Sequence, residues 1–194
     1  MDRYLAGTLE MEERWLTRLC FVASFYEDVY RTGEVTQDSM LADASPRTDL
    51  RALVKAVPPY VEADIAEQMA LAEPAFGPFR VLPPTLIACD PVFAGSTDIG
   101  GADADFIVDG LLLDCKATTM PTRLGSTEIG QLAGYLLLDY HDQYRITQVG
   151  LYLSRQGVVI AWEVPEFFRL LGADTPLPQL RGRLREYLRR WRHQ

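Results

Sequence analysis

The first third of the chain repeats apolar residues at the three- and four-residue spacing of a helix. This pattern predicts three helices, over residues 8–32, 48–57 and about 60–75. Thr8 is placed to cap the first helix and Gly33 to end it, while either Thr48 or Asp49 is placed to cap the second. The proline pair after Val57 separates the second helix from the third.

Further along the chain, the pattern changes to short apolar runs of the strand type. We expect strands over residues 85–90, 103–108, 111–116, 146–153 and 157–164, and helices over residues 126–140, 165–171 and 179–193. The last two strand runs are apolar at most positions, which predicts central or well-covered strands. This order of elements predicts an α/β (α+β) fold class with a mixed central β-sheet flanked by helices.

A hairpin is predicted at Asp109-Gly110, because this dipeptide tolerates the positive φ angles of a two-residue type I′ turn. With the turn fixed, Phe106 lies opposite Leu113, Val108 opposite Leu111, Asp105 opposite Asp114, and Asp103 opposite Lys116. Side chains alternate between the two faces of a strand. One face of the hairpin therefore carries only apolar residues and is expected to face the core: Phe106, Val108, Leu111, Leu113 and Cys115.

The other face of the hairpin ends in a cluster of acidic side chains and one amine, formed by Asp103, Asp105, Asp114 and Lys116. Carboxylates opposite each other on a sheet are roughly 5 Å apart at Cβ and repel unless a positive charge lies between them. A hard divalent cation such as Mg²⁺ would relieve this repulsion, since it needs only one or two carboxylates. With Lys116 beside it, such a cation suits metal-assisted hydrolysis of a phosphodiester.

The helix expected over residues 126–140 adds two polar side chains on one face, because Gln131 and Tyr135 are four residues apart. Gln131 capping a loop and Tyr135 packing in the core is the alternative interpretation. Gly130 and Gly134 weaken the same helix, and the close approach of another backbone or of a nucleic-acid strand would explain them.

Asp105, the tripeptide Asp114-Cys115-Lys116, and Gln131 with Tyr135 together resemble the signature of the PD-(D/E)XK nuclease superfamily, in its RecB-like branch. The resemblance covers roughly residues 60–165 and implies a restriction-endonuclease-like core. It implies that Asp105, Asp114 and the Cys115 backbone carbonyl bind Mg²⁺ or Mn²⁺, and that Lys116 is the catalytic lysine. Gln131 and Tyr135 complete the implied catalytic set by orienting the substrate strand.

Other acidic residues compete for a place in the metal shell. No proline precedes Asp105, and Asp103 is a rival for the first ligand position. The resemblance also makes Glu67 and Glu73, on the helix before the sheet, candidates for a further ligand. A solvated acidic helix face is the alternative for these two glutamates.

At 194 residues with 48% hydrophobic residues, the chain is long enough for one substantial core. We expect a helical extension over residues 1–59, a nuclease-like core over residues 60–175, and an arginine-rich helix over residues 176–194. No apolar run approaches the roughly 18 residues of a membrane span. The three cysteines are widely spaced, which indicates free thiols rather than a disulfide framework and hence a cytoplasmic protein.

The net charge of −8 argues against a protein that coats nucleic acid nonspecifically, because phosphate binding needs a basic surface. Six arginines against one acid lie within residues 178–194, however. Three interpretations compete for this segment: a helix docked on the core with solvated arginines, a clamp on the DNA backbone, or a membrane-surface or calmodulin-target-like helix.

Two functions follow. The first is a Mg²⁺-dependent nuclease that hydrolyses phosphodiester bonds of a nucleic acid, DNA in the first instance, in a defence or repair system. The alternative is a catalytically inactive module with the nuclease fold, which binds nucleic acid or a protein partner in a larger complex.

Overall fold

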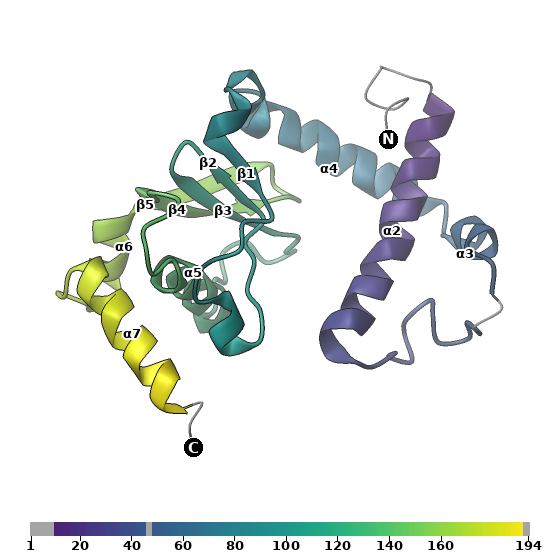
Figure 1. The fold of residues 1–194 in the computed structure, drawn as a ribbon. Helices are drawn as coiled ribbons and strands as arrows, with labels where there is room; N and C mark the ends of the chain where they lie inside the picture. The colour runs from purple at the N-terminus through teal and green to yellow at the C-terminus, as the bar shows by residue number, and fades with distance from the viewer. Residues whose placement is uncertain (1–9, 46–47, 192–194) are drawn as a thin grey trace. The chain divides into compact units, whose positions relative to one another are not determined.

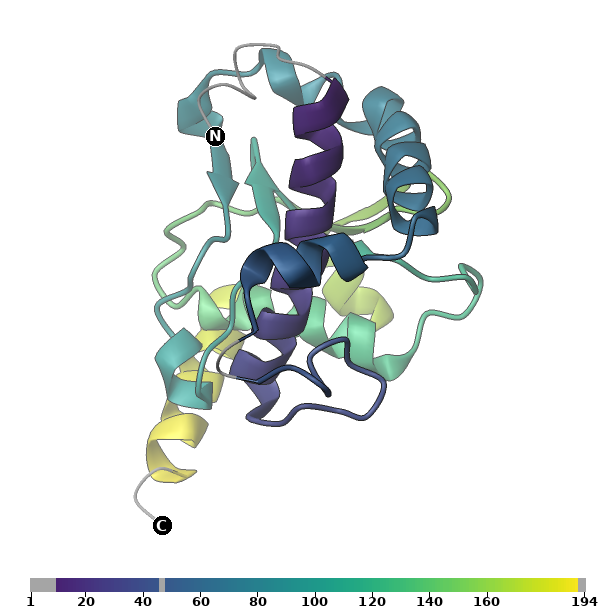
Figure 2. The same cartoon turned by 90° about the vertical axis from the view of Figure 1, so that its right-hand side faces the viewer.

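The computed structural model describes residues 10–45 and 48–191 and divides into two compact units, residues 1–70 and 71–194 (Figure 1). Three α-helices form the described part of the first unit and its connection to the second: α2 (Glu10–Thr32), α3 (Leu50–Ala56) and α4 (Tyr60–Phe76). The division falls within α4. These helices are drawn in purple to blue in Figures 1 and 2.

The three helices of the first unit agree with those predicted from apolar spacing. The Asp49 side chain caps α3 by accepting a hydrogen bond from the Arg51 backbone N–H at 3.3 Å. Gly33, with a φ of 75°, ends α2. Thr8 lies outside the described residues.

A separate small core holds the first unit together. Its most buried members are Val22, Leu53, Val54, Val57 and Val61. Arg18 on α2 binds the carbonyl oxygens of Val54 and Val57, at 3.2 and 3.3 Å, and forms an ion pair with Glu62. One arginine thus satisfies carbonyl groups left open at the end of α3.

The second unit contains a five-stranded mixed sheet in the order β1-β2-β3-β4-β5. The strands are β1 (Ile87–Cys89), β2 (Phe106–Val108), β3 (Leu111–Lys116), β4 (Gln148–Leu153) and β5 (Val158–Glu163). The pair β3–β4 is parallel and the other neighbouring pairs are antiparallel. A parallel pair needs a crossover, and helix α5 (Ser126–Leu138) supplies it. The predicted mixed sheet flanked by helices is confirmed.

The remaining helices are short except for the last. They are η1 (Phe79–Val81), η2 (Pro84–Leu86), η3 (Ser96–Ile99), α6 (Val164–Leu170) and α7 (Leu177–Trp191). Gly125 is the N-cap of α5, and its N–H donates to the Glu128 side chain at 2.9 Å. Across the described residues, no helix combines the length and apolar content that crossing a bilayer requires.

The central hairpin has the register predicted from its turn. Phe106 pairs with Leu113 and Val108 with Leu111. The φ angles of Asp109 and Gly110 are 47° and 80°, as a type I′ turn demands. This register places Asp114 and Lys116 on the same face of the sheet as Ile107 and Leu112.

The core is distributed differently from the expectation. The acid-bearing face of the hairpin is the one that α5 covers, and it holds the larger core, with Leu112, Leu132, Leu136, Val149 and Leu151 fully buried. The apolar face, predicted to be the core side, is covered by Phe76 at the end of α4, whose ring packs edge-on against Phe106 and Tyr152. Both faces of the hairpin are therefore covered.

The expectation of two well-covered strands holds for only one of them. β4 lies between β3 and β5 and is buried along nearly its whole length, whereas β5 is an edge strand with exposed and half-exposed side chains. At Gly150 of β4, a Cβ atom would collide with the backbone of Ile160 in β5. At Gly130 and Gly134 of α5, a Cβ atom would meet no neighbouring atom within 4 Å, so packing against another backbone does not explain these glycines.

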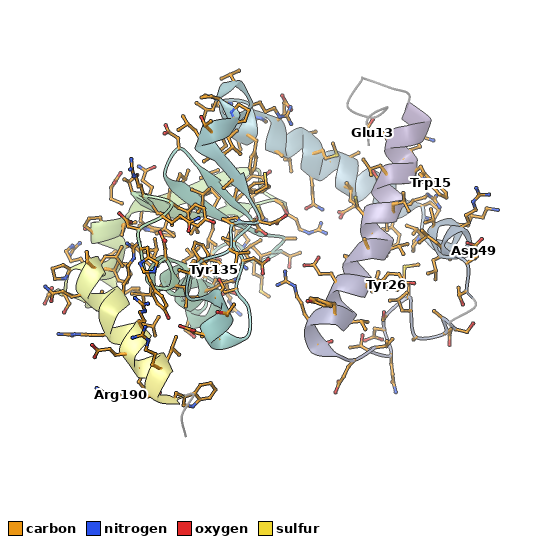
Figure 3. All side chains as sticks on the ribbon, viewed as in Figure 1. Glu13, Trp15, Tyr26, Asp49, Tyr135 and Arg190 are labelled. Atoms are coloured by element: carbon orange, nitrogen blue, oxygen red, sulfur yellow. The ribbon has the colours of Figure 1, made fainter. Side chains whose placement is uncertain are left out.

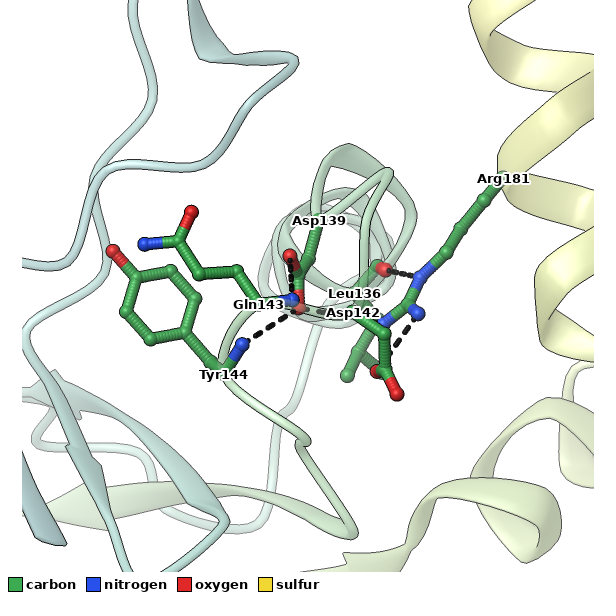
Figure 4. Close-up of polar contacts among 6 residues, drawn as sticks. All are labelled: Leu136, Asp139, Asp142, Gln143, Tyr144 and Arg181. Atoms are coloured by element: carbon green, nitrogen blue, oxygen red, sulfur yellow. Dashed lines mark hydrogen bonds and ion pairs between the residues drawn. The ribbon is translucent and has the colours of Figure 1, made fainter.

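Helix α7 packs against α5 through a buried arginine (Figure 4). Arg181, only 4% exposed, donates through Nε to the Leu136 carbonyl oxygen at 2.9 Å and through Nη1 to the Asp142 carboxylate at 2.8 Å. The buried Asp139 carboxylate lies 3.6 Å from Arg181 and accepts the backbone N–H of Gln143 at 2.9 Å. These contacts fix α7 to the C-terminal end of α5.

Candidate functional site

Five of the residues singled out in the sequence lie together on the face of the sheet that α5 covers. Asp105 immediately precedes β2, and Asp114 and Lys116 alternate along β3. Gln131 and Tyr135 come from α5, on which Figure 3 labels Tyr135. The hairpin register and the crossover of α5 are the two features that bring them together.

Asp105 is tied to the next strand through the backbone. Its Oδ2 accepts a hydrogen bond from the Cys115 N–H at 2.5 Å. This bond crosses the hairpin beyond its last regular pair and fixes the half-buried Asp105 carboxylate close to Asp114. Burial, with the Asp105 and Asp114 charges, raises the pKa of the Cys115 thiol to about 12, so this thiol stays protonated at neutral pH.

Asp114 is a buried carboxylate, 4% exposed. Its Oδ2 forms an ion pair with the Lys116 Nζ at 2.5 Å and, among the described residues, accepts no hydrogen bond of regular geometry. Burial is the main influence on its pKa and raises it, Lys116 and the Tyr135 hydroxyl oppose the shift, and the Asp105 charge adds to it. Burial of this carboxylate therefore outweighs the donors around it.

Lys116, Gln131 and Tyr135 form a continuous chain of hydrogen bonds. The Lys116 Nζ donates to Gln131 Oε1 at 2.8 Å, and Gln131 Nε2 donates to the Tyr135 hydroxyl at 2.5 Å. Because the Gln131 amide is bonded at both ends, it fixes the ammonium and the phenol relative to each other.

The Tyr135 hydroxyl is protonated and available as a donor. Burial raises the pKa of Tyr135 to about 12, the bond from Gln131 opposes the shift, and the Asp114, Asp105 and Asp103 charges add to it. Phe93 stacks on the Tyr135 ring at a centroid distance of 5.5 Å. Sequence reasoning missed Phe93, because only the tertiary fold brings the loop before β2 onto α5.

A hollow of about 300 Å³ opens beside Lys116. The segment between β3 and α5 lines it with Thr118, Thr119 and Arg123, and Glu128 lines it from α5. Arg123 was not among the residues predicted for the site. Its signal in the sequence was its position between the Asp-x-Lys strand and the glutamine helix, the segment that must pass the edge of the site.

The rival acids lie at the margin of this site or elsewhere. Asp103 forms an isolated bridge with Val92 and is near enough to influence Tyr135. Glu73 is exposed on α4 and forms an ion pair with Arg80 at 2.6 Å. Glu67 is exposed in the first unit.

The donor set fits a hard cation such as Mg²⁺. Among residues 10–45 and 48–191, no three His, Cys, Asp or Glu side chains are grouped closely enough to bind a metal. The expected set contains only two carboxylates, Asp105 and Asp114, with the Cys115 carbonyl, and Mg²⁺ commonly binds to one or two carboxylates and keeps several waters. The buried Asp114 Oδ2, which accepts no hydrogen bond of regular geometry and pairs with the Lys116 ammonium at 2.5 Å, is the atom that a cation would share with Lys116.

The fold and the site thus define an α+β protein with two convergent carboxylates, a lysine and a glutamine–tyrosine pair under one crossover helix. No protein-family model, curated protein or solved structure matches this chain.

Proposed function

We propose that this protein is a metal-dependent nuclease that hydrolyses phosphodiester bonds of DNA. The observation that carries the proposal is the contact network that joins Asp114, Lys116, Gln131 and Tyr135 next to Asp105. These side chains supply acidic ligands, a cation and neutral donors within one site, which is what hydrolysis of a phosphodiester requires.

In this proposal, Asp105, Asp114 and the Cys115 carbonyl hold Mg²⁺ or Mn²⁺. When bound, the cation supplies Lewis-acid charge to the phosphate and lowers the pKa of water. Lys116, held between Asp114 and Gln131, orients the attacking water and stabilises charge that develops on the phosphate oxygens. The protonated Tyr135 and Gln131 donate hydrogen bonds that position the strand.

The charge distribution supports a nucleic-acid substrate better than the total charge does. Residues 1–70 contain thirteen acids and seven basic residues, a net charge of −6, which leaves −2 on residues 71–194. The unit that holds the site is therefore almost neutral, and Arg123 beside Lys116 adds positive charge at its edge. Free thiols at all three cysteines are compatible with the cytoplasmic location expected of such an enzyme.

Replacement of Lys116 by Ala tests the proposal. We expect cleavage of plasmid and of linear single-stranded DNA, in Mg²⁺ or Mn²⁺, to fall by about 100-fold or more, because one charge-stabilising donor is lost. Lys55→Ala is the matched control, since Lys55 is the other lysine of the chain and is exposed on α3. Circular dichroism checks that both variants fold. Undiminished Mg²⁺-dependent cleavage by Lys116→Ala contradicts the proposal.

One observation favours the second function, an inactive nuclease-fold module that binds nucleic acid or a protein partner. Only two carboxylates are in the expected metal set, and Lys116 already lies against one of them. Calorimetric titration with Mg²⁺ separates the two functions. A catalytic site must lose its cation affinity in Asp114→Asn, whereas a binding module has no such requirement.

A further inference from the structure

Helix α7 uses one face entirely for packing within its own unit. Its leucines at helical spacing lie against the main core: Leu177, Leu180, Leu184 and Leu188. The buried Arg181 on the same face is bonded to Leu136 and Asp142. The backbone of α7 is therefore fixed, and the leucines of its apolar stripe are not free for another partner.

The C-terminal part of α7 presents two large aromatic rings to solvent. Tyr187 and Trp191 are one helical turn apart and are 65% and 63% exposed. They follow Leu184 and Leu188 by three residues each, at the end of the same stripe, yet both rings remain exposed. Aromatic side chains of this size usually contribute to a core or an interface, so their joint exposure on a fixed helix indicates a binding surface.

Exposed guanidinium groups border these rings. Arg183 precedes Tyr187 by four residues and Arg190 follows it by three, which places both beside Tyr187 on the helix surface. Figure 3 shows Arg190 near the C-terminal end of α7. Besides the buried Arg181, the helix carries four arginines and one glutamate from Leu177 to Trp191, so its outer surface is positive in an otherwise acidic protein.

This combination selects one class of partner. A helix on a membrane surface, or one bound in a protein groove, inserts a continuous apolar face, and in α7 the leucines of that face are packed against the core. Bases stack on exposed aromatic rings, and phosphates pair with arginines, in proteins that bind single strands. The bases of a duplex are paired and stacked, so they cannot use the two rings in this way.

We propose that Arg183, Tyr187, Arg190 and Trp191 form a binding surface for single-stranded nucleic acid, with bases stacked on the two rings and phosphates paired with the two arginines. The inference rests on the proposed function, because the strand held on α7 is the substrate of the site under α5. The surface adds affinity for single strands outside the catalytic residues.

Binding of fluorescein-labelled oligodeoxythymidine to the full chain, followed by fluorescence anisotropy in EDTA, tests the surface without cleavage. We expect Tyr187→Ala and Trp191→Ala each to weaken binding by about tenfold, the cost of losing one stacked base. The double variant Arg183→Gln/Arg190→Gln should lower the slope of log affinity against log salt by about 1.4, since each single-strand phosphate contact contributes about 0.7.

Two control variants match these changes at positions away from α7. Tyr30→Ala removes a ring that is 90% exposed in the first unit, and Arg169→Gln removes an exposed arginine of α6. Both should bind the oligonucleotide as the unchanged protein does. Thermal melting confirms that all variants fold.

Three results would overturn the α7 surface. The first is unchanged oligonucleotide affinity in the α7 variants, and the second is an equal loss of oligonucleotide affinity in the control variants. The third, from a parallel binding assay with phosphatidylglycerol vesicles, is a loss of affinity for the vesicles but not for the oligonucleotide. The catalytic proposal fails separately. If the α7 variants lose oligonucleotide affinity as expected but the unchanged protein cleaves no DNA under any metal condition, the binding surface is supported and the nuclease proposal is contradicted. If the unchanged protein cleaves DNA but the α7 variants keep their oligonucleotide affinity, the nuclease proposal is supported and the binding surface is contradicted.

Discussion

At the residue scale, Asp114 shows how a buried carboxylate at the proposed site lowers the stability of the fold. In metal-free protein, with EDTA present, Asp114→Asn is expected to raise the free energy of unfolding near neutral pH by about 1 kcal/mol. Burial raises the pKa of Asp114, so the folded protein binds this proton more tightly than the unfolded chain does. The destabilisation caused by the charged Asp114 carboxylate is therefore fully present above its folded-state pKa. It disappears as the pH falls below 3.8, the ordinary pKa of this carboxyl.

Urea unfolding in EDTA at several pH values measures this effect. The difference in free energy of unfolding between Asp114→Asn and the unchanged protein should be largest near neutral pH and should fall to zero at acidic pH. Asp109→Asn is the matched control, because Asp109 is exposed in the turn of the same hairpin and should change stability by less than about 0.5 kcal/mol. A less stable Asp114→Asn protein at neutral pH would contradict the interpretation.

At the element scale, the hairpin was predictable and its covering was not. The Asp109-Gly110 turn fixes which residues pair and which share a face, because both follow from local geometry. Which face a later helix covers depends on the crossover from β3 to β4, and alternation within a hairpin contains no information about that. Asp114 was consequently expected on a face other than the core side, whereas α5 buries it.

Arg181 is the clearest case of a signal that was present in the sequence. It was grouped with the other arginines of residues 178–194, although it lies four residues after Leu177 and three before Leu184. That spacing places it on the packed face of α7. The partners that make its burial tolerable, the Leu136 carbonyl and Asp142, come from a distant segment that no local pattern identifies.

Arg181→Met is expected to lower the free energy of unfolding by about 3 kcal/mol, because it removes one member of a buried charged network and leaves Asp139 uncompensated. Arg183→Met, an exposed position on the same helix, should change stability by less than about 0.5 kcal/mol. Chemical denaturation followed by circular dichroism measures both. Equal effects of the two substitutions would show that the Arg181 contacts contribute nothing specific.

At the scale of the whole molecule, the described residues form two cores rather than one. One is formed by α2, α3 and the start of α4, and the other by the sheet with α5, α6 and α7. The sequence does not mark the division at residue 70, because it falls inside a helix whose apolar spacing continues across it. Local pattern predicts that α4 exists, but only the contacts at each end assign its halves to different units.

Separate cores predict separate unfolding transitions, and the tryptophans can report on them individually. Trp15 lies in the first unit, and Trp162 and Trp191 lie in the second. Val54→Ala, at a fully buried position of the first core, should cost about 2 kcal/mol in the transition reported by Trp15. The transition reported by the other two tryptophans should not move.

Each transition is observed in a background where the tryptophans of the other unit are replaced by Phe. Leu151→Ala is the reciprocal variant, because Leu151 is fully buried in the core of the sheet and should shift only the transition of the second unit. DNA cleavage should then follow the second transition, since all five proposed catalytic residues lie within residues 71–194. If both substitutions move a single common transition, the two cores unfold as one cooperative unit, and the activity of the site depends on the helical unit as well.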